Sequence, residues 1–212
     1  MYNIKNFKSR LKTASILFLL FFICLKNIYI YKILIKIVFL IIIFEYSSNL
    51  IKSDNLSLIR FSLIGILWLV PFFYLILTNS RNNILKILVV NAISDIFQYI
   101  FGNIFGKFIK YKPFPLISPN KTLIGYFLGL TISFFIASLI FNFKYYELLL
   151  ILLFGIMGDL FASYIKRKLK IKDFSNILSK HGGVLDRLDS LIFSLTLFSL
   201  FKFLKKGLIL HK

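Results

Sequence analysis

The stretch from Thr122 to Phe141, TLIGYFLGLTISFFIASLIF, carries no charged side chain. The hydrocarbon core of a bilayer is about 30 Å thick, and an α-helix needs roughly 20 apolar residues to cross it. The stretch reaches that length and predicts a transmembrane helix. The rest of the chain can be interpreted outward from this segment.

Six further apolar runs resemble the first. Together they predict an all-α, polytopic integral membrane protein with about seven transmembrane helices. Lys26, Lys32 and Lys36 interrupt the two earliest runs, so this region is either one long tilted helix or two short spans. The six runs are 13 to 30, 31 to 46, 57 to 78, 84 to 105, 145 to 165 and 184 to 204.

The composition excludes an ordinary soluble domain. The 212 residues are 58% hydrophobic and 17% charged, against about 45–50% apolar and about 25% charged in soluble domains. The net charge of +19 comes from 27 Lys and Arg against 8 Asp and Glu. These basic residues punctuate apolar runs and do not build one polar face, so we expect a membrane and no nucleic acid as the partner.

Only two polar stretches between the runs are long, Gly106 to Lys121 and Lys166 to Gly183, and both are strongly basic. Two predicted spans separate them, so they share one face of the membrane. The positive-inside rule makes that face cytoplasmic, at the inner membrane if the source is bacterial. One conflict is that a seventh span would put the lysines at 202, 205 and 206 on the far side. Either the last helix does not cross fully or the early span count is off by one.

Four carboxylates lie where they are energetically costly. Asp95 and Asp159 fall inside apolar runs, and Asp186 and Asp189 open the last run. A charged side chain at the centre of a membrane helix costs about 2.5–3.5 kcal/mol on insertion scales, and such residues usually have a function. For each one the alternative is a buried ion pair with Lys or Arg. Taken together, four short carboxylates favour a site for a hard cation such as Mg²⁺.

A short segment before the last run combines features of a phosphate site. Gly182 and Gly183 let the backbone approach a ligand, and the following helix would offer N–H groups that attract phosphate. Asp186 and Asp189 lie three residues apart, on one face of that helix. Simpler interpretations stay open, because a glycine pair is often only a turn, His181 is often only an interfacial residue, and Arg187 can equally contact lipid headgroups.

The residues from 163 to 189 resemble the C-terminal signature of the phosphatidate cytidylyltransferases, also called CDP-diacylglycerol synthases. Upstream, Ser94-Asp95 through Gly106-Lys107 resembles the Asp-led segment of that family, and Ser118-Pro119-Asn120-Lys121-Thr122 resembles its Ser-Pro loop. The resemblance covers about residues 84 to 200. The matching signature positions are Ser163, Ile165, Lys166, Arg167, Lys172, Asp173, Ser175, Leu178, His181, Gly182, Gly183, Val184, Asp186, Arg187, Leu188 and Asp189.

The resemblance implies a division of the chain and a reaction. Residues 1–83 would be N-terminal membrane spans, and residues 84–212 a catalytic transmembrane domain with its active site on the C-terminal helices and cytoplasmic loops. CMP would pass from CTP to phosphatidate, giving CDP-diacylglycerol and pyrophosphate. Mg²⁺ is the expected cofactor, with a second cation left open, and a homodimer is left open as the assembly.

The resemblance also implies roles for individual residues. The catalytic residues would be Asp186, Asp189, Lys172 and Asp173. The metal ligands would be Asp186, Asp189, Asp159 and Asp95. The substrate-binding residues would be Ser118, Lys121, Thr122, Ser163, Lys166, Arg167, His181, Gly182, Gly183 and Arg187.

Three positions depart from the family pattern: Ala162 stands in place of Glu, Ser179 in place of Pro or Gly, and Asn120 in place of Lys. The missing Glu is the most serious departure, because a polar group beside Asp159 is lost.

Two alternative functions stay open. One is a CTP-dependent lipid kinase of the polyprenol or phytol type, and the other is a transporter or noncatalytic membrane protein.

Overall fold

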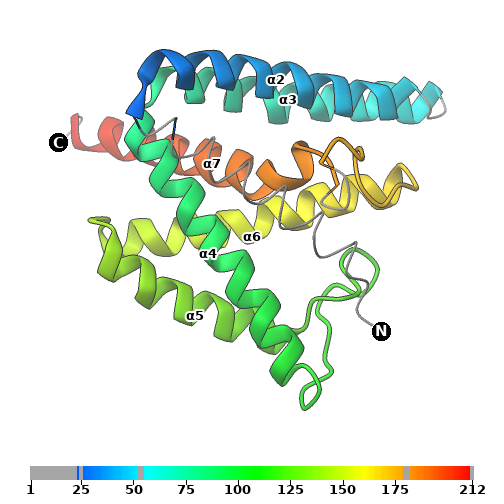
Figure 1. The fold of residues 1–212 in the computed structure, drawn as a ribbon, viewed down its shortest axis with the longest axis vertical. Coiled ribbons are helices and arrows are strands. Elements are labelled where there is room, and N and C mark those ends of the chain that lie inside the picture. The colour runs from blue at the N-terminus through cyan, green and yellow to red at the C-terminus, as the bar shows by residue number, and fades with distance from the viewer. Residues whose placement is uncertain (1–22, 24–25, 52–54, 179–181, 211–212) are drawn as a thin grey trace. The chain divides into compact units, whose positions relative to one another are not determined.

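The structure is a computed structural model that describes residues 23, 26–51, 55–178 and 182–210, and this part of the chain contains helices and loops but no strand. The predicted all-α class is confirmed. Figure 1 shows the helices in chain order. They are α2 (Ile28–Ile51), α3 (Asn55–Thr78), α4 (Arg81–Phe105), α5 (Leu123–Ile140), α6 (Tyr145–Lys168) and α7 (Leu185–Leu210).

Four helical segments in the described part of the chain are long and apolar enough to cross a membrane. They are Ile59–Thr78 within α3, and the whole of α4, α5 and α6. The polytopic membrane class is therefore confirmed. The count of about seven stays a prediction, and most of the expected first run lies outside the described residues.

Helix α2 begins with a cap. The side-chain Oδ1 of Asn27 accepts hydrogen bonds from the backbone N–H groups of Tyr29 at 2.9 Å and Ile30 at 3.3 Å. This is the bonding pattern of an N-cap residue, which satisfies amides that have no partner inside the helix. Helix α2 therefore starts at Ile28. The choice between one long tilted helix and two short spans stays a prediction, because most of the first run lies outside the described residues.

The chain divides into two compact units, whose boundaries fall inside α4, α6 and α7. Unit 1 contains Met1–Asn82 and Ile165–Leu188, and unit 2 contains Asn83–Tyr164 and Asp189–Lys212. The signature segment 165–188 thus groups with the N-terminal helices. The division at 83/84 stays a prediction about function, since the compact units cut the chain differently.

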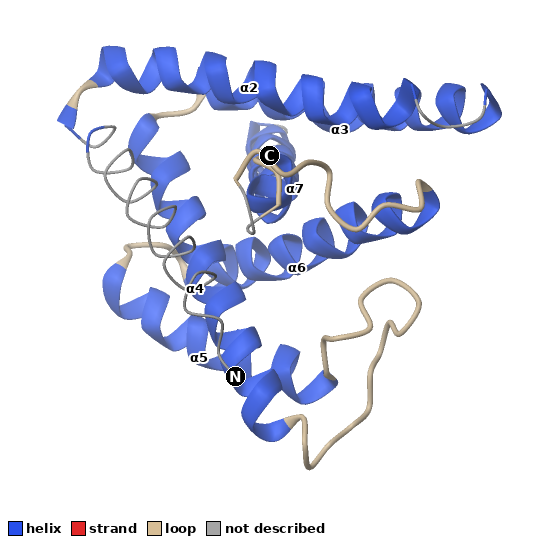
Figure 2. Ribbon diagram, turned by 45° about the vertical axis from the view of Figure 1, so that its right-hand side comes forward, coloured by secondary structure: helices blue, strands red, loops and turns tan. Residues whose placement is uncertain are grey.

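In unit 1, α2 and α3 run side by side in opposite directions (Figures 1 and 2). The rings of Phe39 and Phe73 stack with centroids 3.7 Å apart. Nearer the other end of the pair, the Tyr46 hydroxyl donates a hydrogen bond of 2.6 Å to the Phe61 carbonyl. These contacts fix the face of α2 that carries Glu45 and Asn49.

In unit 2, glycines bring α5 against α4. A methyl group on Gly129 would lie 2.6 Å from the Gln98 Cα, and one on Gly125 would lie 2.9 Å from the Gly102 Cα. The two α5 glycines are four residues apart, which is the small-xxx-small pattern of close helix contacts in membranes. A buried hydrogen bond of 2.6 Å from Asn91 Nδ2 to Ser194 Oγ joins α4 to α7.

The C-terminal part of α7 reaches the start of α6. Lys205 Nζ donates to the Tyr146 hydroxyl at 2.8 Å, and Lys202 Nζ lies 3.6 Å from Glu147 Oε1. The C-terminal part of α7 thus lies at the opposite end of α6 from the signature loop. Whether α7 crosses the membrane fully, and whether the early span count is off by one, both stay predictions.

Candidate active site

The end of α6 holds Lys166 in a fixed backbone geometry. The Ile171 N–H donates to the Lys166 carbonyl at 2.9 Å, and the Lys170 N–H donates to the Arg167 carbonyl at 3.1 Å. Lys170 has φ 55°. These two bonds and the left-handed residue form a Schellman motif, which satisfies the last carbonyls of a helix. The motif ends α6 sharply and turns the chain into the signature loop.

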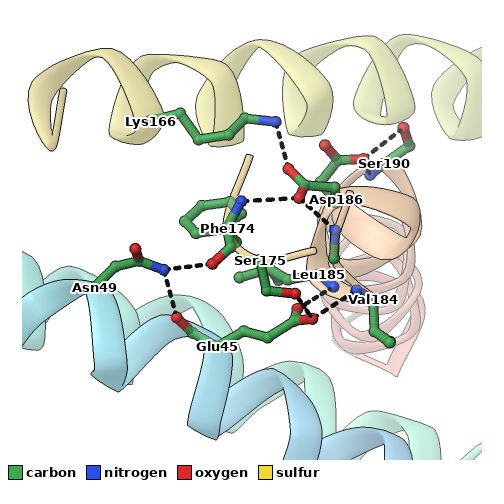
Figure 3. Close-up of polar contacts among 11 residues, drawn as sticks. Glu45, Asn49, Lys166, Phe174, Ser175, Val184, Leu185, Asp186 and Ser190 are labelled. Atoms are coloured by element: carbon green, nitrogen blue, oxygen red, sulfur yellow. Dashed lines mark hydrogen bonds and ion pairs between the residues drawn. The ribbon is translucent and has the colours of Figure 1, made fainter. Parts of the chain in front are cut away.

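Asp186 ties this loop to α6 and to the start of α7 (Figure 3). Its Oδ1 lies 2.8 Å from Lys166 Nζ, and the two side chains are only 5% and 11% exposed. Its Oδ2 accepts from the backbone N–H groups of Phe174 and Gly183, both at 2.9 Å. One carboxylate thereby joins residues that are up to twenty positions apart in the sequence.

The first turn of α7 is capped by a carboxylate from a distant helix. Glu45 of α2 is fully buried. Its Oε1 accepts from the Ser175 hydroxyl at 2.5 Å and from the Val184 N–H at 2.9 Å, and its Oε2 accepts from the Leu185 N–H at 2.8 Å. Figure 3 shows this carboxylate facing the N-terminal end of α7, at Val184 and Leu185. Negative charge is stabilised here by the helix dipole and by the unpaired amides.

The two glycines are required by this packing. Gly182 has φ 79°, a conformation that side chains other than glycine rarely adopt. A methyl group on Gly182 would lie 3.0 Å from Asp186 Oδ2 and 3.3 Å from Asp173 Oδ1, and one on Gly183 would lie 2.7 Å from both oxygens of Glu45. The glycines therefore let the backbone touch three carboxylates. An anion at this helix end would compete with Asp186 and Glu45 for the amides.

The second polar cluster lies in unit 2. Lys121 Nζ forms an ion pair of 2.7 Å with Asp159 Oδ2, with side chains 30% and 20% exposed. Burial lowers the pKa of the Lys121 ammonium, but the attraction of Asp159 and of Asp95 outweighs that effect and raises the pKa above its ordinary value. Lys121 is thus positively charged, and it is attracted by two of the predicted metal ligands.

Asp189 and Asp95 are linked through Ser190. The buried Asp189 accepts from the Ser190 N–H at 2.8 Å, and the Ser190 hydroxyl lies 3.4 Å from Asp95 Oδ2. These contacts hold two predicted metal ligands near one hydroxyl within unit 2.

The Ser-Pro loop connects α4 to α5 and is the irregular segment between them in Figure 2. Thr122 caps α5, because its side chain accepts from the Gly125 N–H at 3.3 Å. The Ser118 carbonyl accepts from the Lys121 N–H at 3.4 Å. The Thr122 hydroxyl therefore has a structural role in addition to the predicted role in binding phosphate.

The remaining predicted residues lie at the edges of these clusters. Ser163 is buried, whereas Arg167, Lys172, Asp173 and Arg187 are exposed. Their exposure suits contact with a charged ligand from outside. His181 lies outside the described residues.

The predicted carboxylates do not gather into a metal centre within either unit. In the described part of the chain, no three His, Cys, Asp or Glu side chains come together as ligands. Asp186 and Asp159 instead face lysine ammonium groups. This is the ion-pair alternative that the sequence left open, realised at two of the four positions.

Sequence reasoning missed Glu45. It lies in the apolar run 31 to 46, next to its end, and that position was the one available signal. Its partners lie about 130 to 140 residues further along the chain. No local pattern reveals such a distant contact.

Taken together, the chain is a polytopic helical membrane protein in which Lys166 pairs with Asp186 and Lys121 pairs with Asp159. A family model described as the cytidylyltransferase family matches residues 1–204. The chain belongs to the cytidylyltransferase family.

Several curated proteins are similar to it. The phosphatidate cytidylyltransferase of Staphylococcus haemolyticus is 38% identical over 138 residues, which cover 61% of this chain and 52% of that protein. Those of Helicobacter pylori J99 and Aquifex aeolicus are 41% and 43% identical over 137 and 112 residues, covering 58% and 51% of this chain and 48% and 42% of those proteins. The chain spans about half the length of the curated relatives it matches.

Proposed function

We propose that this chain is a phosphatidate cytidylyltransferase, transferring CMP from CTP to phosphatidate to give CDP-diacylglycerol and pyrophosphate. The observation that carries the proposal is the contact of Lys166 with Asp186 at 2.8 Å, together with the Gly183 amide on the same carboxylate. These three residues belong to the signature that the sequence shares with this enzyme class. The names of the similar proteins support the same reaction.

In the proposed reaction, a phosphate oxygen of phosphatidate attacks the α-phosphorus of CTP. The bond from that phosphorus to the bridging oxygen of the β-phosphate breaks in line, and the oxygen leaves with pyrophosphate. Both reactants are anionic, so positioning and charge neutralisation are the main tasks. No general base is needed, because phosphatidate is already ionised at neutral pH.

Basic residues beside the Asp186 carboxylate would neutralise the triphosphate. Lys166 has three N–H donors, one of which donates to Asp186, so it can also donate to a phosphate oxygen. Arg167 follows it in the chain and Lys172 lies in the loop after α6, and both are exposed. In this arrangement Asp186 sets the position of the lysine, and the exposed pair reaches the leaving pyrophosphate.

The proposal includes Mg²⁺ only because the predicted ligands are carboxylates. Carboxylate oxygens are the protein ligands that this ion prefers. In unit 2, Asp189, Asp159 and Asp95 offer such oxygens, and Asp159 would exchange its contact with Lys121 for the ion. In unit 1, Asp186 would exchange its contact with Lys166. A bound Mg²⁺ would neutralise charge on the phosphates. We expect EDTA to abolish turnover and added Mg²⁺ to restore it, and full turnover in EDTA would remove the metal from the proposal.

The site assignment is tested with the protein purified in detergent, phosphatidate, Mg²⁺ and labelled CTP. We expect Asp186→Asn to lower the turnover rate by at least about 100-fold, the scale of losing a charged group that positions a reacting phosphate. The neutral amide would no longer attract Lys166. Glu147→Gln is the matched control, because Glu147 contacts Lys202 and the Lys144 amide in unit 2. Full activity of Asp186→Asn would show that this site is wrongly assigned.

A further inference from the structure

Helix α2 holds the signature loop at two positions one helical turn apart. Glu45 accepts from Ser175, Val184 and Leu185, and Asn49 Nδ2 donates to the Phe174 carbonyl at 2.6 Å. Figure 3 shows both side chains reaching from α2 toward the loop. We call Glu45 and Asn49 the α2 clamp.

The clamp acts on the residues that surround Asp186. The N–H of Phe174 donates to Asp186 while its carbonyl accepts from Asn49. The N–H of Gly183 donates to Asp186, and the next two amides donate to Glu45. Each backbone segment that holds Asp186 is thus held in turn by α2.

Side-chain packing supports the same arrangement. The Phe174 ring is 2% exposed, and its centroid lies 6.1 Å from that of Tyr46 on α2. Lys166 Nζ lies 5.5 Å from the centre of the Phe174 ring. The lysine that pairs with Asp186 therefore rests on a residue that α2 fixes.

Burying the charge of Glu45 costs free energy unless hydrogen bonds compensate for it. A buried carboxylate is tolerated when it is fully hydrogen-bonded, and Glu45 meets this condition with three donors at the positive end of α7. A helix start can be capped locally by Ser, Thr, Asp or Asn. The chain instead places a carboxylate from a helix 140 residues away at this point, which couples α2 to the loop.

We propose that Glu45 is a positioning residue, which with Asn49 fixes the backbone at Phe174 and at Val184–Leu185 so that Asp186 and Lys166 keep their geometry for the nucleotide. This inference rests on the proposed function, and it assigns a role to the N-terminal helices that neither the signature nor the similar proteins' names provide. Glu45 acts through Asp186 and does not itself touch substrate.

The test compares Glu45→Gln and Asn49→Ala with the unaltered protein and with Glu147→Gln, the chain's other glutamate. In Glu45→Gln the new side-chain NH₂ group would face a backbone N–H group that now donates to the carboxylate. Two donors would then face each other, and one hydrogen bond would be lost. We expect kcat/KM for CTP to fall by about 100-fold, the scale of small misplacements of reacting groups. The KM for phosphatidate should stay within about twofold, because the clamp supports residues assigned to the nucleotide.

Hydrogen exchange supplies a readout that does not depend on activity. We expect the peptide covering 174–188 to exchange faster in Glu45→Gln and in Asn49→Ala, and to be unchanged in Glu147→Gln. Kinetics are measured well below the unfolding temperature of each variant. A merely structural role would lower the active fraction and leave both KM values unchanged. Asn49→Ala keeps the Glu45 charge, so it tests the clamp by itself if Glu45→Gln does not fold.

The outcomes separate the two proposals. If the unaltered protein makes no CDP-diacylglycerol but exchange in 174–188 rises as expected, the proposed function fails and the clamp stands as a structural device only. If the unaltered protein is active, and both clamp variants keep its kcat/KM for CTP and its exchange pattern, the positioning role of Glu45 is overturned.

Discussion

Asp186 shows how far single residues could be assigned from the sequence. The free-energy cost of a carboxylate in an apolar run indicated that Asp186 has a function, and a buried ion pair was the alternative. The pair with Lys166 realises that alternative. The partner was within reach of prediction, because both residues belong to one signature. The hydrogen bonds from the Phe174 and Gly183 amides to the same carboxylate could not be predicted, because they depend on the backbone conformation of the loop.

Lys121 carries a prediction about pH. Its pKa is raised above the ordinary value because Asp159 and Asp95 outweigh the effect of burial. A group whose pKa is raised on folding stabilises the protein fully below its unfolded pKa, about 10.4 for lysine. That contribution is lost only as the pH rises through the higher folded value.

We therefore expect the difference in thermal stability between the protein and Lys121→Met to stay constant from about pH 7 to pH 10. The difference should shrink only above that range. Thermal unfolding in detergent across this range measures it. A difference that disappears by pH 9 would contradict the charged pair with Asp159.

At the scale of elements, hydropathy located the helices well because a bilayer crossing demands a fixed length. The uncharged run 122 to 141 became α5, Leu123–Ile140, and the run 57 to 78 became α3, Asn55–Thr78. The ends were harder to place. The Schellman motif after α6 uses a left-handed lysine, Lys170, where glycine is usual, and the α7 cap comes from another helix.

The α4–α5 contact gives a prediction at this scale. Gly129→Ala would place a methyl group 2.6 Å from the Gln98 backbone, whereas the same change at Gly102 meets nothing closer than 3.6 Å. We expect Gly129→Ala to destabilise the protein by about 1–3 kcal/mol, the usual cost of overpacking. Gly102→Ala should be neutral or slightly stabilising, since alanine is the better helix former. Equal unfolding temperatures for the two variants would contradict the close approach of α5 to α4.

At the scale of the whole molecule, composition and hydropathy were sufficient for the all-α membrane class, and the signature for the family. The grouping of the signature segment with the N-terminal helices was not predictable. It follows from contacts such as Glu45 with Leu185, which join distant parts of the chain. In the sequence, residues 1–83 show only the pattern of membrane spans, and nothing in that pattern indicates a contact with the signature segment.

Topology can be measured with single cysteines. The chain has one native cysteine, Cys24, so Cys24→Ala provides the background. Lys110 and Asn142 are exposed on the loops at opposite ends of α5. We expect an impermeant thiol reagent to label Lys110→Cys from the cytoplasmic side and Asn142→Cys from the other side. Labelling of both from one side would contradict a membrane-spanning α5, and reversed labelling would overturn the cytoplasmic face.

The most direct test of the proposed activity follows the fate of each phosphate of CTP. The purified protein is incubated with phosphatidate in mixed micelles and with CTP labelled at either the α- or the γ-phosphate. We predict that the α-label enters the lipid product while the γ-label is released in pyrophosphate. Transfer of the γ-label to a lipid would identify a kinase, and no transfer of either label by the folded protein would contradict a cytidylyltransferase activity.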